Sequence, residues 1–212
     1  TWTRFDFTKI SGILIVGGYN TREGKQMSSG SLELEFHGRY VDSVIARERK
    51  QYPARRQVEA SLVFSKKRQG LFMYQPDGAY KDGRLNWAPP QGEIQEGESL
   101  EDAVRREASE EFALSLGPVT YLGSVMRQFR PGHPKAKMFD SATYHWTCAI
   151  ADCYTFIPEF GVAKAGWHHA PGLLNWCCER MSPDKAAMFK AAMARAIEGP
   201  LFKVPVWQHA FI

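Results

Sequence analysis

Three glutamates in one short stretch of the sequence could together hold a metal ion. Glu107, Glu110 and Glu111 stand at positions i, i+3 and i+4, so on a helix their carboxylates project to one side and crowd together. Like charges at this spacing repel by roughly 0.2–0.5 kcal/mol per pair. A solvated acidic face is the ordinary interpretation of such a run. A divalent cation is the alternative, because magnesium takes carboxylates, water and substrate phosphates as ligands.

The residues around the glutamates predict the helix that they need. Ser99 can cap the first turn, and Asp102 follows three residues later, at the spacing of a capping box. Four apolar residues at helical spacing supply a face to bury: Leu100, Ala103, Val104 and Ala108. The three carboxylates lie on a different face of this helix.

The spacing of the charged residues and glycines here resembles the Nudix box, the signature of the Nudix hydrolases. The matching positions are Gly92, Glu98, Arg106, Glu107, Ala108, Glu110, Glu111 and Leu114. Ala113 departs from the pattern, which expects glycine at that position. Since a glycine there usually relieves a left-handed backbone, we expect Ala113 to cost about 1 kcal/mol of stability without removing a metal ligand.

The resemblance implies a magnesium site, with manganese as an alternative ion. Its ligands would be Glu107, Glu110 and Glu111, joined by the carbonyl oxygen of Gly92. These ions would bridge phosphate oxygens and neutralise charge as a phosphoanhydride bond breaks.

Two further roles follow from the same resemblance. Glu98 and Arg106 would form an ion pair that ties the loop before the helix to the helix itself. The segment Pro158-Glu159-Phe160 is similar to a late segment of RNA pyrophosphohydrolases, which implies that Glu159 is a further metal ligand or the general base. Whether Glu159 or one of the box glutamates takes the proton from the attacking water stays open.

A basic loop after the next strand is a candidate for binding substrate phosphates. Its cations are Arg127, Arg130, Lys135 and Lys137, and four permanent charges beside a carboxylate trio could meet the charge of a triphosphate. A solvated surface loop is the alternative. Three nearby aromatic residues could stack on a base or belong to the core: Phe129, Phe139 and Tyr144.

The residues just before the Nudix-like motif favour one class of substrate. Residues 87–92 read Trp-Ala-Pro-Pro-Gln-Gly and are followed by Gly97-Glu98-Ser99, which is similar to the RNA pyrophosphohydrolases and the plant-type dinucleoside tetraphosphate hydrolases. This implies removal of pyrophosphate from a 5′-triphosphorylated RNA end. Diadenosine tetraphosphate and nucleoside triphosphates are the alternative substrates. A nucleotide- or RNA-binding Nudix subunit with little catalysis is the alternative from another class, favoured by Ala113 and disfavoured by the intact glutamates.

The fold class that we expect is α/β (α+β), a Nudix α/β/α sandwich around a mixed sheet, in a domain over residues 57–200. Its predicted strands cover residues 58–64, 71–74, 119–126 and 142–150, and its last helix covers residues 182–198.

The regions on either side of that domain are predicted as additions to it. Before the domain, we expect a β-rich extension over residues 1–56. A buried strand is predicted at 10–16, a strand with alternating apolar and charged residues at 31–36, and a third strand at 40–46. The basic run 47–56 is either a linker or a ridge that faces phosphates. After the domain, residues 201–212 form an apolar tail. The extension and the tail are candidate surfaces for a protein partner.

Composition agrees with a single soluble domain that binds a polyanion. The chain has 212 residues, 44% hydrophobic and 24% charged, with a formal net charge of +4, which suits a nucleotide or 5′-phosphorylated RNA. No apolar run is long enough for a membrane span, so no membrane partner is expected. The four cysteines lack zinc-ligand spacing and predict reduced thiols in the cytoplasm or mitochondrial matrix. The first residue is Thr1, which leaves room for a targeting segment outside this sequence.

Overall fold

The structure is a computed structural model that describes residues 29–65, 70–77, 87–129, 134–168 and 173–198. The chain divides into two compact units, Thr1–Glu33 and Leu34–Ile212. The second unit carries the sheet, the helices that cover it and every candidate residue discussed below. The predicted strand at 10–16 and the apolar tail at 201–212 lie outside the described residues.

A mixed sheet forms the centre of the second unit. Its path runs β4-β5-β1-β2-β6, and the short β3 pairs with β1 beside that path. The strands are β1 (Arg55–Ser65), β2 (Gly70–Pro76), β3 (Gln91–Glu93), β4 (Thr120–Gln128), β5 (Ser141–Ile150) and β6 (Val162–His168). β1 and β5 are parallel, and the other pairs are antiparallel. The four predicted strands are confirmed as parts of β1, β2, β4 and β5.

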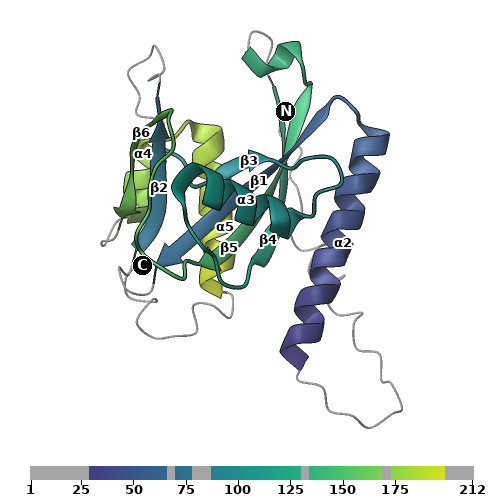
Figure 1. Cartoon of the computed structure of the whole chain (residues 1–212). Coiled ribbons are helices and arrows are strands. Elements are labelled where there is room, and N and C mark those ends of the chain that lie inside the picture. The colour runs from purple at the N-terminus through teal and green to yellow at the C-terminus, as the bar shows by residue number, and fades with distance from the viewer. Residues whose placement is uncertain (1–28, 66–69, 78–86, 130–133, 169–172, 199–212) are drawn as a thin grey trace. The chain divides into compact units, whose positions relative to one another are not determined.

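Helices cover both faces of this sheet. α3 (Leu100–Phe112) lies on one face, and α5 (Pro183–Glu198) lies on the other with the short α4 (Leu173–Glu179) (Figure 1). Alternate residues of β1 pack to opposite sides: Leu62 joins the cluster under α5, whereas Val63 joins the cluster under α3. The expected α/β/α sandwich is therefore confirmed.

Both covering helices bury an apolar stripe, and the stripe of α3 includes the four residues predicted for it. In α3 the buried residues are Leu100, Ala103, Val104, Ala108 and Phe112. In α5 they include Ala186, Phe189, Met193 and Ala196. The predicted helix at 182–198 begins at Pro183, where the missing N–H of proline loses no intrahelical bond.

The strands predicted at 31–36 and 40–46 are wrong. One helix, α2 (Ser29–Gln51), occupies both stretches. The alternation of Leu and Glu is short, and both residue types have a high helix propensity. Val41 and Ile45 stand four residues apart, and both are buried in the cluster under α3, so the longer period of 3.6 decides the structure. The β-rich description of the extension therefore fails over these residues.

The last turns of α2 hold the loop that leads into α3. Asp42 accepts a hydrogen bond from the backbone N–H of Leu100, at 2.9 Å, and Arg49 donates to the carbonyl oxygen of Ile94. The basic run 47–56 is not an extended linker, because it ends α2 and begins β1. None of the described helices is long and apolar enough to cross a membrane.

Candidate active site

The loop before α3 reaches the centre of the sheet through β3. Gln91, Gly92 and Glu93 pair antiparallel with Val58, Glu59 and Ala60 of β1. A Cβ atom on Gly92 would overlap the carboxylate of Glu107. Only glycine at position 92 therefore lets this carboxylate of α3 lie directly against the backbone of β3.

Local signals fix where α3 begins and ends. The side chain of Ser99 accepts a hydrogen bond from the backbone N–H of Asp102 at 3.1 Å and donates to its carboxylate at 2.7 Å. The helix ends at Ala113, whose φ of 55° and ψ of 31° are left-handed. Ala113 is the one non-glycine residue with positive φ in the described part of the chain, so the expected backbone strain falls where the pattern calls for glycine.

Arg106 lies at the centre of the acidic residues. It forms two hydrogen bonds with the Glu98 carboxylate, at 2.8 and 3.0 Å, and a third with the carbonyl oxygen of Glu93 at 3.0 Å. The same guanidinium donates to Glu107 at 2.7 Å and to Glu110 at 3.3 Å. The hydrogen bonds from Arg106 lower the pKa of Glu98. Arg106 therefore joins the loop to the helix and also contacts two of the three box glutamates.

A second loop brings Glu159 to the end of α3. Its backbone N–H donates to the carbonyl oxygen of Glu111 at 2.7 Å, and that of Ile157 donates to Phe112 at 2.8 Å. Burial, followed by the negative charges of Glu107 and Glu159, raises the pKa of Glu111 to about 7. Glu159 and Glu111 are thus neighbours although 48 positions separate them in the sequence.

A fourth carboxylate, not singled out from the sequence, lies beneath the box glutamates. Glu59 is fully buried in the middle of β1. Burial raises its pKa well above the usual value, and the negative charges of Glu107 and Glu111 add to that rise. One sequence signal points to it: Gln57, Glu59 and Ser61 alternate with apolar residues on a strand that lies inside the sheet.

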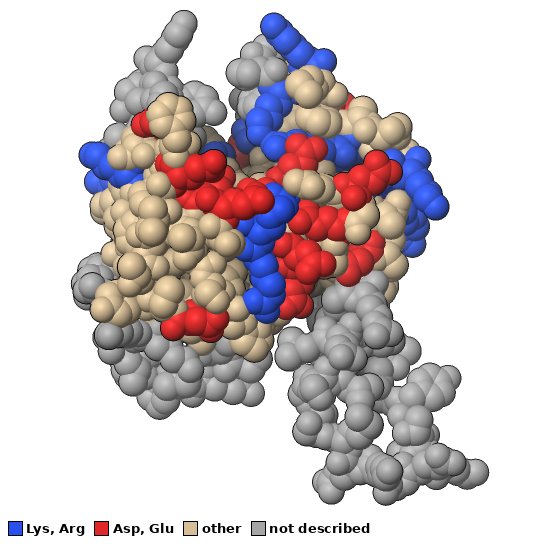
Figure 2. All heavy atoms as spheres, viewed as in Figure 1, with Lys and Arg blue, Asp and Glu red and all other residues tan. Residues whose placement is uncertain are grey.

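The donor set suits a hard divalent ion, but the carboxylates do not yet converge on one point. Among the described residues, no three His, Cys, Asp or Glu side chains form a ready metal-binding group, because Arg106 binds Glu107 and Glu110. Oε2 of Glu111 and Oε1 of Glu59 are buried without a hydrogen-bond partner within these ranges. A cation would satisfy such oxygens, which are the ligand type that magnesium prefers. Figure 2 shows acidic side chains gathered over the middle of this face.

Basic side chains from four different elements lie close to one another: Arg56, Arg127, Lys135 and Lys185. Loss of hydration and the positive charges of Arg56 and Arg127 lower the pKa of Lys135. Burial, then Arg127 and Lys135, lowers the pKa of Lys185 to about 8. The structure therefore brings the predicted Arg127 and Lys135 together and adds Lys185 of α5, which the sequence did not reveal. Arg127 also lies 3.7 Å from Asp184.

The remaining predicted substrate residues have different surroundings. Lys137 is exposed at the end of a short 3-10 helix (Pro134–Lys137), and Phe139 is half-buried just after it. Phe129 packs against the core beside Arg127. Arg130 lies outside the described residues.

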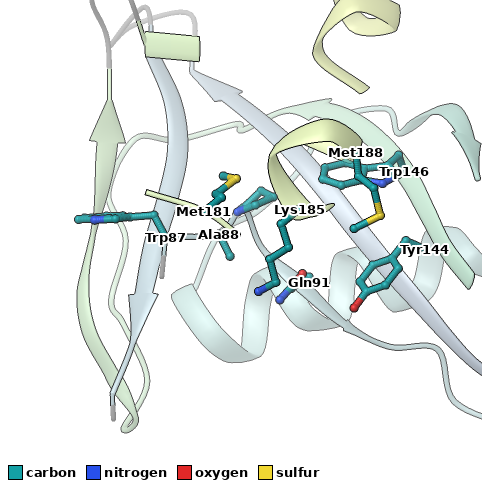
Figure 3. Close-up of a pocket in the computed structure, with 9 residues that line it drawn as sticks. Trp87, Ala88, Gln91, Tyr144, Trp146, Met181, Lys185 and Met188 are labelled. Atoms are coloured by element: carbon teal, nitrogen blue, oxygen red, sulfur yellow. The ribbon is translucent and has the colours of Figure 1, made fainter. Parts of the chain in front are cut away.

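A pocket lies on the α5 side of the sheet, next to the start of the box. Its walls are Trp87, Ala88, Pro89, Gln91, Tyr144, Trp146, Met181, Lys185 and Met188. Figure 3 shows the side chains of Lys185 and Gln91 extending to the same place in the pocket, with the ring of Tyr144 across from them. Tyr144, predicted as a stacking residue, lines this pocket, as do Trp87 and Trp146.

A family model described as the NUDIX domain matches residues 54–195, more than half of the chain. Three solved structures share the fold at low identity. The NUDIX domain of Shewanella oneidensis NrtR, in complex with ADP ribose, is 20% identical with a TM-score of 0.52, over 69% of this chain and 92% of that one. A NUDIX hydrolase from Nitrosomonas europaea is 14% identical with a TM-score of 0.51, over 66% and 89%. A MutT protein from Methanosarcina mazei Go1 is 14% identical with a TM-score of 0.50, over 66% and 94%. No curated protein matches the sequence.

Proposed function

The chain belongs to the Nudix family of hydrolases, which act on pyrophosphate bonds, and we propose that it removes pyrophosphate from 5′-triphosphorylated RNA. One observation carries this proposal. The segment from Trp87 to Gly92 lines the aromatic pocket at one end and receives the Glu107 carboxylate at the other. A nucleotide bound along this segment would therefore bring its phosphates toward the box glutamates.

The carboxylates can hold a divalent ion, either Mg²⁺ or Mn²⁺. Glu107, Glu110 and Glu111, with the carbonyl oxygen of Gly92, are the proposed ligands, and Arg106 would give up its contacts with Glu107 and Glu110 when the ion binds. A bound ion would neutralise charge on the phosphates as the bond breaks. Glu98 keeps Arg106 close to the site after this exchange, because it holds the guanidinium by two hydrogen bonds.

Glu111 and Glu159 are the two candidates for the group that takes a proton from the attacking water. Without a bound ion, burial and the neighbouring acids raise the pKa of Glu111 to about 7; a divalent cation would lower it, so Glu111 can be the base only if it does not bind the ion. Glu159 is exposed, and its backbone is bonded to that of Glu111, so it can reach water on the solvent side. For either residue to act as the base, its carboxylate must lie on the side of the substrate from which the water attacks.

The basic residues favour a polymer over a free nucleotide. Arg127 and Lys185 lie close to the pocket and can meet the terminal phosphates. Lys137 is exposed at the end of the turn Pro134–Lys137, where a free nucleoside triphosphate would have no further phosphate to contact it. The phosphate backbone of RNA would continue over this turn.

The test compares substrates at equal concentration with Mg²⁺ present. Pyrophosphate release is measured from a 5′-triphosphorylated oligonucleotide and from GTP, with diadenosine tetraphosphate and ADP ribose as further substrates. ADP ribose is included because the Shewanella NUDIX domain binds it. We expect the oligonucleotide to react much faster than GTP. Equal rates would refute the RNA proposal and leave a nucleotide hydrolase.

Matched variants separate catalysis from binding. Glu110→Gln removes a proposed ligand, whereas Glu101→Gln alters an exposed carboxylate of the same helix that pairs with Arg105 instead. We expect Glu110→Gln to lose activity and Glu101→Gln to keep it. If the parent chain binds the oligonucleotide but hydrolyses none of these substrates, it is a nucleotide- or RNA-binding Nudix subunit.

A further inference from the structure

Glu59 differs from its neighbours in a buried column of polar side chains. This column covers the α3 side of β1 and β5. Oε1 of Gln57 accepts a hydrogen bond from Nε2 of His145 at 2.7 Å, and Nε2 of Gln57 donates to Glu48 of α2 at 3.2 Å. Thr143 also donates to Glu48, at 2.9 Å. These contacts tie α2 to the sheet and account for the polar residues at that end of the column.

The carboxylate of Glu59 is only half satisfied by such contacts. Ser61 donates to its Oε2 at 2.6 Å, and Ser61 contacts Thr147 at 3.0 Å. Its Oε1 has no hydrogen-bond partner among the described residues, although the side chain has no exposed surface. A buried carboxylate oxygen without a partner is unusual. Such an oxygen can be satisfied by a hydrogen-bond donor or by a cation.

The backbone register shows where that carboxylate lies. Glu59 is directly opposite Gly92 in the antiparallel pair of β1 and β3. Opposite residues in such a pair have their Cβ positions on the same face, roughly 5 Å apart. The Cβ position of Gly92 is filled by the carboxylate of Glu107. Glu59 and Glu107 therefore meet on the α3 side of the sheet, one approaching from the strand and the other from the helix.

No positive side chain explains this meeting of two acids. Arg106 binds Glu107 but makes no ion pair with Glu59 in the part of the chain that the structure describes. His145 is the partner of Glu59 across the parallel pair of β1 and β5. Burial lowers the pKa of His145 to about 4, so at neutral pH it carries no charge to offset a carboxylate.

We propose that Glu59 is a further ligand of the divalent cation, supplied by the sheet beneath the three ligands of α3. This inference rests on the proposed cation site and extends it, because it adds a ligand that lies outside the box. Glu59 and the Glu107 carboxylate share the α3 side of the sheet, so a bound ion would satisfy the acids of the strand and of the helix together.

Binding of Mn²⁺ to the full chain tests this proposal without any substrate. The affinity is measured by the electron paramagnetic resonance signal of free Mn²⁺, for the parent and for Glu59→Gln, Glu107→Gln and Ser61→Ala. We expect Glu59→Gln to weaken binding by at least about tenfold. Ser61→Ala removes the hydrogen bond to Glu59 but keeps the carboxylate, so its affinity should stay close to that of the parent.

The variants distinguish the two ways in which the idea can fail. If Glu107→Gln weakens Mn²⁺ binding and Glu59→Gln does not, the cation site stands and Glu59 is not a ligand. If Glu107→Gln also leaves Mn²⁺ binding unchanged, these glutamates do not form the cation site. The proposed role of Glu59 is then refuted as well. A loss in Ser61→Ala equal to that in Glu59→Gln would show that the polar column acts by structure alone.

Stability without metal is the second readout. Thermal unfolding in EDTA should occur at the same temperature in the parent and in Glu59→Gln, while added Mn²⁺ stabilises the parent more. If Glu59→Gln does not fold, Glu59→Asp replaces it. Aspartate keeps the carboxylate on a side chain that is one methylene shorter. Weaker Mn²⁺ binding in this variant supports the proposal, and unchanged binding refutes it.

Discussion

Replacing Gly92 by alanine should abolish most activity while leaving the fold intact. A contact between carbon atoms needs about 3.5–4.0 Å, and an added Cβ would lie well inside that distance from the Glu107 carboxylate. The backbone of Gly92 has no positive φ, so alanine fits the strand itself. The carboxylate of Glu107 must therefore move by about 1 Å or more, and a shift of about 1 Å at a reacting centre lowers the rate by roughly 100-fold.

Stability should change much less than activity in this variant. Alanine restricts the unfolded chain and so favours folding by about 0.4–1 kcal/mol. Loss of the partly exposed pair between Arg106 and Glu107 removes at most about 1 kcal/mol. The two effects oppose each other, so the melting temperature should stay within about 2–4 °C of the parent.

The assay for this prediction is kcat/KM with the triphosphorylated oligonucleotide, together with thermal unfolding. Gly166→Ala is the matched control, because that glycine also lies in a strand and an added Cβ there meets nothing within 4 Å. Combining Gly92→Ala with Glu107→Asp should cause less than the summed loss, since the shorter acid leaves room for the methyl group. Full activity in Gly92→Ala would refute the idea that Glu107 must lie against Gly92.

Three other predictions concern stability, pH and substrate binding. Ala113→Gly should raise the free energy of unfolding in urea by about 1 kcal/mol, because glycine accepts the left-handed backbone. Ala187→Gly, on the exposed side of α5, should lower it by roughly 0.5–1 kcal/mol, and a loss in both variants would contradict the strain at Ala113. The pKa of Glu111 is raised from 4.5 to about 7 in the folded state, so its contribution to stability is present below pH 4.5 and is lost as pH rises through 7. Urea titrations in EDTA should show this decline, and Glu111→Gln should flatten it; an unchanged slope would refute the assignment. Lys185→Met should weaken binding of the triphosphorylated oligonucleotide by about tenfold, whereas Lys190→Met, on the exposed side of the same helix, should not. Binding by the parent should weaken as pH rises through 8, where Lys185 loses its proton; pH-independent binding would contradict that role.

Sequence reasoning succeeded where the decisive interactions are local. The helix from Leu100 to Phe112 follows from the cap at Ser99 and from an apolar stripe, and both signals lie within a few turns. The strands of the sheet follow from short apolar runs. The left-handed backbone at Ala113 could be expected as well, because helix ends of this kind depend on one residue.

The same reasoning failed where a short pattern had two interpretations. Residues 31–36 alternate like a strand, yet they belong to α2. Val41 and Ile45 are buried in the cluster under α3, and this burial stabilises the helix. The residues at 31–36 alone do not reveal that contact. Tertiary packing overrides weak local preference in such a stretch.

The sequence by itself determined the family and the helix that carries Glu107, Glu110 and Glu111. These features depend on residues at fixed short spacing, which a chain shows without folding. Only the tertiary structure decided that Glu59 lies beneath the acids, that Glu159 lies beside Glu111, and that Lys185 joins the basic residues at the pocket. Each of these side chains reaches the site from a different strand, loop or helix, and their distances depend on how the sheet is ordered and covered.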